Sequence, residues 1–395
     1  MKHFTKIACL PCLLLAGVSC SENTSGHKAI DPTVEVRQSP MSLSDVARML
    51  AALPIGGVQM QEVYGAVGSS TGDGYDEEYT LRDLILAPGS GVGGAPTKAP
   101  AEGQALRDLI AEYLGRTLAS TKGGAADVQA YLDALASSDY QIYWPYSDVW
   151  DGETLPLVTF DPGFGADVNW AYEISAVDGS LEVTDSVVVT EEVAQQRPVW
   201  VINHNDDSAF TPLEFYTRSA AAVAPSVNNS ADIPATKSGT RTLYLRSLRM
   251  LRNYDTWFGG GSEFWVKCGA VNDFSASTEA ELKLYSPTLT EFMIVVPRSM
   301  KGKDMSFDAV LLSGFSNQLD KLAFLVTEDD GGTRTSWKCS ATVKIKSRSY
   351  GFDLDIPYND KDDIVWRGSL AASFFQSEDE VVGRFGDVEI TFALE

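Results

Sequence analysis

An acidic loop near the C-terminus is the sharpest candidate for chemistry in this chain. The sequence reads Asn-Asp-Lys-Asp-Asp from Asn359 to Asp363, and it follows residues 350–357, where apolar and polar side chains alternate. Such a strand would bury its aromatic side chains and deliver Asp360, Asp362 and Asp363 to the loop at its end. Clustered carboxylates suit Ca²⁺, which takes about six to eight oxygen ligands. The sequence therefore predicts calcium as a cofactor of these three residues, with a solvated acidic turn as the more ordinary alternative.

Histidine chemistry is poorly supplied. Beyond residue 20 the chain has His27, which falls in the expected tether, and His204. These two residues make either a two-histidine metal site or a conventional hydrolase triad a poor expectation. The HExxH, GxSxG, Walker A and paired CxxC motifs are absent from the sequence. An enzyme of this sequence would therefore use carboxylates, with Asp206, Asp207 or the acidic loop as general acid and base. The Asn and Asp residues around His204 are equally typical of a strand-to-turn junction.

Two aromatic clusters could contact a ligand. One covers residues 143–150, and the other covers residues 254–265 around three consecutive glycines. Flat aromatic faces stack on sugars, so a glycan is one expected partner and a protein is another. The commoner role of such residues is to fill the core of a β-sandwich.

The N-terminus has the layout of a secretory signal. Lys2 and Lys6 precede the apolar residues 7–16, and small residues lead into Cys20. The segment resembles the lipobox of bacterial lipoproteins, without the usual Leu three residues before the cysteine, a departure that lipoproteins of the Bacteroidota tolerate. The resemblance implies that Cys20 becomes the acylated N-terminus of a membrane-anchored chain. An ordinary signal peptide cut nearby is the alternative.

Composition limits the partners. The 395 residues carry 54 acidic and 31 basic side chains, a formal net charge of −23. A surface this negative repels phosphate backbones, so we expect no nucleic-acid partner. No segment after Cys20 has the roughly eighteen consecutive apolar residues of a membrane span. We therefore expect the chain to meet the membrane through its lipid anchor, at the outer membrane or cell surface.

Two cysteines remain after the lipidation residue. Cys268 and Cys339 occur in similar strand-like contexts, each three residues or fewer after a tryptophan. Outside the cytoplasm such a pair can form a disulfide, which is the prediction here. Two separate buried thiols are the alternative, because the sequence does not fix the distance between the two residues.

The segmentation of the chain predicts an α+β protein, with an N-terminal helical and mixed region followed by an antiparallel β-sandwich. We expect helices at 42–53, 58–67, 105–118 and 125–135, where apolar residues recur at helical spacing. The predicted boundaries are a signal peptide at 1–19, a tether at 20–38, a mixed domain at 39–217, a linker at 218–240 and a sandwich at 241–395.

The predicted sandwich has nine strands. Short β-branched and aromatic segments alternate with turn residues from 242 to 394. Its expected strands lie at residues 242–248, 263–271, 280–285, 291–297, 308–313, 321–327, 336–345, 351–357 and 387–394.

Two resemblances bear on function. The lipobox-like N-terminus and the sequence segments at 254–258 and 362–368 resemble those of uncharacterised surface lipoproteins of the Bacteroidota. The sequence Asp362 to Gly368 also resembles, loosely, the acidic loop and following strand of C2 domains. These features imply a lipid-anchored envelope protein with a non-enzymatic binding or adhesion role. A carboxylate-dependent extracytoplasmic hydrolase is the alternative.

Overall fold

The computed structural model describes residues 41–88, 103–119, 125–174, 186–206, 209–215 and 240–395. The predicted signal peptide, Cys20, the tether, Asp207 and residues 218–239 of the predicted linker lie outside these ranges. Among the described residues, no helix is long and apolar enough to cross a membrane.

Helices dominate the beginning of the described chain. Ser42 caps α1 (Leu43–Ala51): its hydroxyl accepts a hydrogen bond from the N–H of Asp45, whose carboxylate accepts one from the N–H of Ser42. All four expected helices are present, and α2 continues beyond its expected end at Val67. The other helices are α2 (Gly57–Gly72), α3 (Leu81–Leu86), α4 (Leu106–Ala119), α5 (Ala125–Ala136) and α6 (Glu191–Ala194).

These helices accompany a six-stranded sheet in the order β1-β2-β6-β3-β4-β5. Strands β3 and β6 are parallel, and the other neighbours are antiparallel. Alternate side chains face two separate cores, because successive residues of a strand point to opposite faces. Thus Trp200 packs with the helices, whereas Val201 packs on the other face. The strands are β1 (Glu78–Thr80), β2 (Tyr140–Tyr143), β3 (Leu157–Phe160), β4 (Asn169–Glu173), β5 (Ser186–Val189) and β6 (Val199–His204).

A loop from the later part of the chain completes that second face. Trp257 and Phe258 pack into the cluster that contains Val201, and both are almost fully buried. The indole N–H of Trp257 donates to the carbonyl of Asp167 at 2.9 Å. The amide of Asn203 donates to the carbonyl of Phe258 at 3.0 Å. The loop is therefore joined to the first sheet by both apolar contacts and hydrogen bonds.

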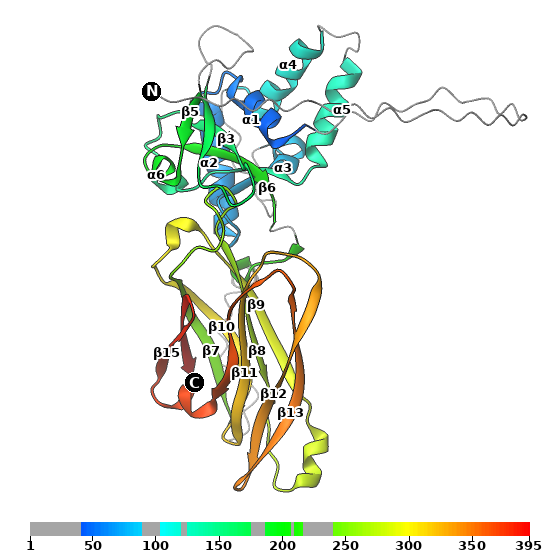
Figure 1. Ribbon diagram of the computed structural model, residues 1–395, viewed down its shortest axis with the longest axis vertical. Helices are drawn as coiled ribbons and strands as arrows, with labels where there is room; N and C mark the ends of the chain where they lie inside the picture. Colours follow the sequence, from blue (N-terminus) through cyan, green and yellow to red (C-terminus); the bar gives the residue numbers. More distant parts are fainter. Residues whose placement is uncertain (1–40, 89–102, 120–124, 175–185, 207–208, 216–239) are drawn as a thin grey trace, which may run out of the picture. The chain divides into compact units, whose positions relative to one another are not determined.

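Two antiparallel sheets follow and pack as a sandwich-like pair (Figure 1). The hydrophobic core between them contains inward side chains of both sheets, including Leu245, Phe264, Phe324 and Phe392. One sheet has the order β10-β7-β16-β15, with β7 (Thr240–Met250), β10 (Met305–Ser316), β15 (Glu380–Phe385) and β16 (Val388–Leu394). The other has the order β13-β12-β11-β8-β9, with β8 (Ser262–Ala270), β9 (Thr288–Val296), β11 (Leu319–Glu328), β12 (Arg334–Ile345) and β13 (Arg348–Asn359), and β14 (Asp363–Ala371) pairs with β11.

The β12–β13 hairpin has its own long ladder, from the Arg334–Asn359 pair to the Ile345–Arg348 pair. It joins β11 through Leu319 paired with Val343 and Lys321 paired with Thr342. A small cluster formed by Ala323, Leu325 and Ile356 packs between the hairpin and the sheet.

The expected disulfide is not formed, since Cys268 and Cys339 are free thiols. Cys268 points into the core between the two sheets, whereas Cys339 packs against the separate cluster beneath the β12–β13 hairpin. Similar sequence contexts therefore lead to different faces of the sheet.

The strand expected at 280–285 is a 3-10 helix, η3 (Glu279–Leu284). The Glu281 carboxylate accepts a hydrogen bond from the N–H of Ser277 at 2.7 Å. A local bond of this kind competes with sheet pairing and favours a turn. The alternation of apolar residues alone did not reveal this.

Candidate metal centre

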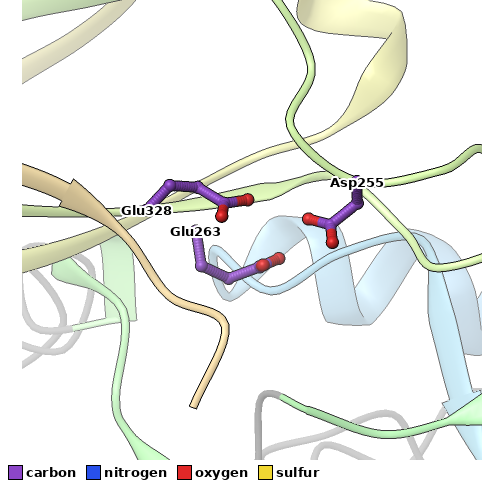
Figure 2. A group of neighbouring side chains, drawn as sticks. All are labelled: Asp255, Glu263 and Glu328. Atoms are coloured by element: carbon purple, nitrogen blue, oxygen red, sulfur yellow. The ribbon is translucent and has the colours of Figure 1, made fainter. Parts of the chain in front are cut away.

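Three carboxylates converge at one end of the sandwich. Asp255 comes from the loop between β7 and β8, Glu263 from the start of β8, and Glu328 from the end of β11. One oxygen of each lies within 4.8 Å of the others. Figure 2 shows the three side chains pointing toward a common space.

Strand register explains the position of Glu328. Phe324 and Val326 face the core between the sheets, and Glu328 is the next member of the same inward row. Its neighbour across the ladder on β8 is Phe264, and the N–H of Asp329 donates to the carbonyl of Glu263 at 2.9 Å. The same pairing therefore brings Glu328 and Glu263 to adjacent positions.

Arg298 fixes the Asp255 loop. Its guanidinium donates to the carbonyl of Asp255 at 3.0 Å and to that of Gly260 at 3.3 Å. The same group makes a 2.9 Å ion pair with Glu191, and the Arg298 side chain is only 5% exposed. Much of its charge is thus balanced by Glu191 rather than by the three converging carboxylates.

Burial is the decisive property of the cluster. Glu328 has 0% exposure and Glu263 has 4%. Within the described part of the chain, both carboxylate oxygens of Glu328 and one of Asp255 are inaccessible, and they have no hydrogen-bond partner other than each other. Leaving a buried carboxylate unsatisfied costs several kcal/mol, so such a group requires either a proton or a cation.

The electrostatics agree with that requirement. Burial, and next the charge of Asp255, raises the pKa of Glu328 to about 11. Burial also raises the pKa of Asp255 to about 6. Two carboxyl groups this close share a proton when no cation is present, because both cannot ionise without strong repulsion.

Further carboxylates surround the cluster. Asp206, just after β6, keeps contact with solvent, but the surrounding protein and then the charge of Asp255 raise its pKa to about 7. The Asp76 carboxylate accepts a hydrogen bond from the N–H of Gly261 at 2.7 Å. Asp330 adds its charge to both Asp255 and Glu328. The local potential is therefore strongly negative.

The sequence-predicted calcium loop lies beside the cluster rather than at its centre. Asp360 accepts a hydrogen bond from the N–H of Thr333 at 2.7 Å, and Asp362 accepts one from the N–H of Asn359 at 2.9 Å. The other oxygen of Asp362 is buried, and the carboxyl group also lies within hydrogen-bonding reach of the Asp329 side chain and the Asp330 backbone. Burial raises the pKa of Asp362, with a further contribution from Asp329. Two of the three predicted ligands therefore have local roles in closing the turn.

Sequence reasoning missed Asp255, Glu263 and Glu328 as a group. Glu328 precedes Asp-Asp-Gly-Gly, which has the composition of a turn, and Glu263 begins a strand. The sequence contains one indication of this site. Glu328 follows Phe324 and Val326 at intervals of two residues, so alternation along a strand would place its side chain on the same inward face. Convergence with Asp255 depends on tertiary contacts that no local pattern contains.

The histidine and the aromatic residues that the sequence singled out have structural roles. His204 is exposed, and its Nδ1 lies 3.0 Å from a carboxylate oxygen of Asp139. Trp144, Trp257 and Phe264 are at most 1% exposed, so they belong to hydrophobic cores. The two aromatic clusters of the sequence are therefore largely core.

The donor set selects among metal ions. Carboxylate oxygens without sulfur or imidazole suit a hard cation. Calcium–oxygen distances of about 2.3–2.6 Å allow two ligand oxygens to lie up to about 5 Å apart, which is compatible with the observed 4.8 Å. Magnesium usually keeps several waters, whereas the oxygens of Glu328 are inaccessible to solvent. The residues therefore fit Ca²⁺ better than Mg²⁺.

No protein-family model, curated protein or solved structure matches this chain.

Proposed function

We propose that this chain is a lipid-anchored, non-enzymatic binding component of the cell envelope whose β-sandwich holds a calcium ion at Asp255, Glu263 and Glu328. The observation that carries the calcium proposal is Glu328, a fully buried carboxylate whose neighbour within hydrogen-bonding reach is another carboxyl group, that of Asp255. The envelope location rests on Cys20 and the signal-like segment before it. The ligand is a glycan or a protein rather than a nucleic acid, in keeping with the net charge of −23.

The ion would link three segments of the chain. It would join the β7–β8 loop, through Asp255, to the ends of β8 and β11, through Glu263 and Glu328. The same loop carries Trp257, which packs on the six-stranded sheet. Calcium binding would therefore hold both the sandwich end and the loop that contacts the first sheet.

Calorimetry and thermal unfolding of the full chain test this proposal. Binding to the folded state stabilises it by about 2.7 kcal/mol when free calcium is about a hundred times the dissociation constant. Each kcal/mol corresponds to roughly 1–2 °C for a chain of this size. We therefore expect a melting temperature several degrees higher in millimolar calcium than in chelator, at matched ionic strength.

The Glu328→Gln variant should lose this response, because it lacks the central buried carboxylate. In chelator it should be at least as stable as the natural chain, because the amide carries no charge to bury. Glu380→Gln, on the exposed face of β15, is the matched control and should respond normally. Coincident melting curves with and without calcium, or an unaltered response in Glu328→Gln, would contradict the proposal.

A carboxylate-dependent hydrolase is the second candidate. It is favoured by the raised pKa values of Asp206, at about 7, and Asp255, at about 6, which suit general acid and base groups near neutral pH. Turnover of 4-nitrophenyl glycosides with a bell-shaped pH profile, abolished in Asp206→Asn, would support it. If the chain binds calcium but hydrolyses none of these 4-nitrophenyl glycosides, the non-enzymatic binding function is favoured.

A further inference from the structure

A second candidate site shares no residue with the cluster of Asp255, Glu263 and Glu328. A cavity of about 340 Å³ opens beside β1 and the start of β2. Its lining includes carboxylates of Glu78, Asp83 and Asp139 and the aromatic rings of Tyr75 and Tyr140. The calcium proposal uses none of these residues.

Charge at the cavity favours a cation. Three carboxylates line it, against the single guanidinium of Arg82. Asp139 is held in place by the 3.0 Å contact with His204. An anionic ligand would meet like charges here, whereas an ammonium group would meet complementary ones.

The uncharged polar groups also present acceptors. The amide nitrogen of Asn205 donates to Glu78 at 2.9 Å and to Gln141 at 2.8 Å. Both amide hydrogens are thereby engaged, which fixes the orientation of the side chain and leaves its oxygen as an acceptor. A ligand with several donors and a positive charge matches this lining.

Aromatic rings complete the recognition surface. Tyr75, Tyr140 and Phe210 line the cavity. The Tyr75 hydroxyl donates to the carbonyl of Phe210 at 3.5 Å, and the Phe210 ring lies edge-on to Trp265 with 6.2 Å between centroids. Ring faces attract organic cations and contact their methylene chains.

We propose that this cavity binds a primary ammonium group carried on an alkyl chain. The ammonium offers three donors to the carboxylates and to Asn205, and the methylenes contact the rings. A free diamine and a lysine side chain of a peptide share this chemistry. The proposal does not depend on calcium binding at Glu328.

Titration calorimetry of the calcium-equilibrated full chain tests whether the ammonium group comes from a free diamine or from a lysine side chain. The probes are 1,5-diaminopentane, Nα-acetyl-lysine methylamide, the neutral isostere 1,5-pentanediol and methyl glucoside. Both amines should bind, and the diol and the glycoside should not. Stronger binding of the lysine derivative would identify a peptide as the source, and stronger binding of the diamine a free polyamine. Salt at 0.5 M should weaken both, since exposed charge pairs are screened.

Variants locate the binding in this cavity. Asp139→Asn should weaken amine binding about threefold to fivefold, the upper part of the range for a partly exposed charge pair. Asp133→Asn, which makes the same charge change on an exposed residue of α5, should leave it unchanged. A melting temperature equal to that of the natural chain would show that Asp139→Asn remains folded. Equal binding of diol and amine, binding of the glycoside alone, or full affinity in Asp139→Asn would each overturn the proposal.

Discussion

Glu328 and Asp363 lie directly opposite each other in the antiparallel ladder of β11 and β14. Paired residues project from the same face, so the two carboxylates repel, and the charge of Asp363 contributes to the raised pKa of Glu328. The acidic loop that is visible in the sequence therefore borders the cluster that the fold assembles.

This relationship separates the two candidate sets of calcium ligands. Asp363→Asn should keep the calcium response and should stabilise the chelated protein by at most about 1 kcal/mol, because it removes a negative charge beside the two carboxyl groups that share a proton. Melting curves in calcium and in chelator provide the measurement. If Asp362→Asn/Asp363→Asn abolished the response while Glu328→Gln kept it, the ion would bind the loop as the sequence predicts.

Glu77 should make stability depend on pH. Burial, and next the charge of Asp76, raises the pKa of Glu77 to about 8 from 4.5. Because the folded-state pKa is the higher one, the neutral form favours folding. The contribution is complete below about pH 4.5, is lost progressively as pH rises to about 8, and is constant above that. Since one pKa unit corresponds to about 1.4 kcal/mol, the loss amounts to several kcal/mol at most.

Urea unfolding in chelator between pH 5 and pH 8 measures this slope. Glu77→Gln should flatten it, whereas Glu192→Gln, at an exposed position on α6, should not. A slope that is unchanged in Glu77→Gln would assign the pH dependence to other carboxyl groups.

Replacing Arg298 should affect both stability and calcium affinity. Arg298→Gln breaks the ion pair with Glu191 and weakens the hold on the Asp255 carbonyl. Removing one partner of a buried pair costs about 3–5 kcal/mol, and Glu191 is 28% exposed, so we expect about 2–3 kcal/mol. Denaturant unfolding should show this loss, with partial recovery in Arg298→Gln/Glu191→Gln. The exposed Arg334→Gln is the control.

Two nearby glycines should respond differently to alanine. A Cβ at Gly261 would lie 2.6 Å from the carbonyl oxygen of Val296, whereas a Cβ at Gly259 would meet the carbonyl oxygen of Thr256 at 3.4 Å. Gly261→Ala should therefore destabilise by about 1–3 kcal/mol, the usual cost of overpacking. Gly259→Ala should cost less, and equal melting temperatures for the two variants would contradict the geometry at Gly261.

Cys20 is the predicted lipid attachment residue. An alkyne fatty acid fed to cells should label the natural chain, and Cys20→Ala should abolish both the label and the recovery of the protein in membranes. Two or three acyl chains hold a protein firmly in a membrane, whereas one holds it weakly. Because Cys20→Ala removes the predicted attachment residue for these chains, nearly all of the variant should appear in the soluble fraction. Labelling that persists in the variant would exclude this residue.

Local signals predicted much of the fold, and distant contacts decided the rest. The predicted helix at 42–53 begins within one residue of the start of α1, because apolar spacing and the Ser42 cap are signals that lie within a few residues. Strand β14 escaped prediction, because its partner β11 lies about forty residues earlier and its sequence mixes charged, apolar and glycine residues. The acidic loop predicted as a calcium site borders the carboxylate cluster, since Asp363 at its end pairs with Glu328. The full cluster required the β7–β8 loop to bring in Asp255.

The β12–β13 hairpin has a consequence for local unfolding. Its ladder satisfies its own backbone groups over twelve residue pairs, while its connection to β11 runs through Leu319–Val343 and Lys321–Thr342. Lifting the hairpin would break these few pairs and the small cluster around Ile356, and it would withdraw Ala341, Val343 and Ile345 of β12 from the main core, while the facing side chains of β7, β8, β11 and β16 keep their contacts with one another. Amide hydrogens of Ala323 and Leu325 also belong to the β8 and β14 ladders and would stay protected. Hydrogen exchange should therefore report the hairpin as a separate cooperative unit, which opens at lower free energy than the sheet beneath it.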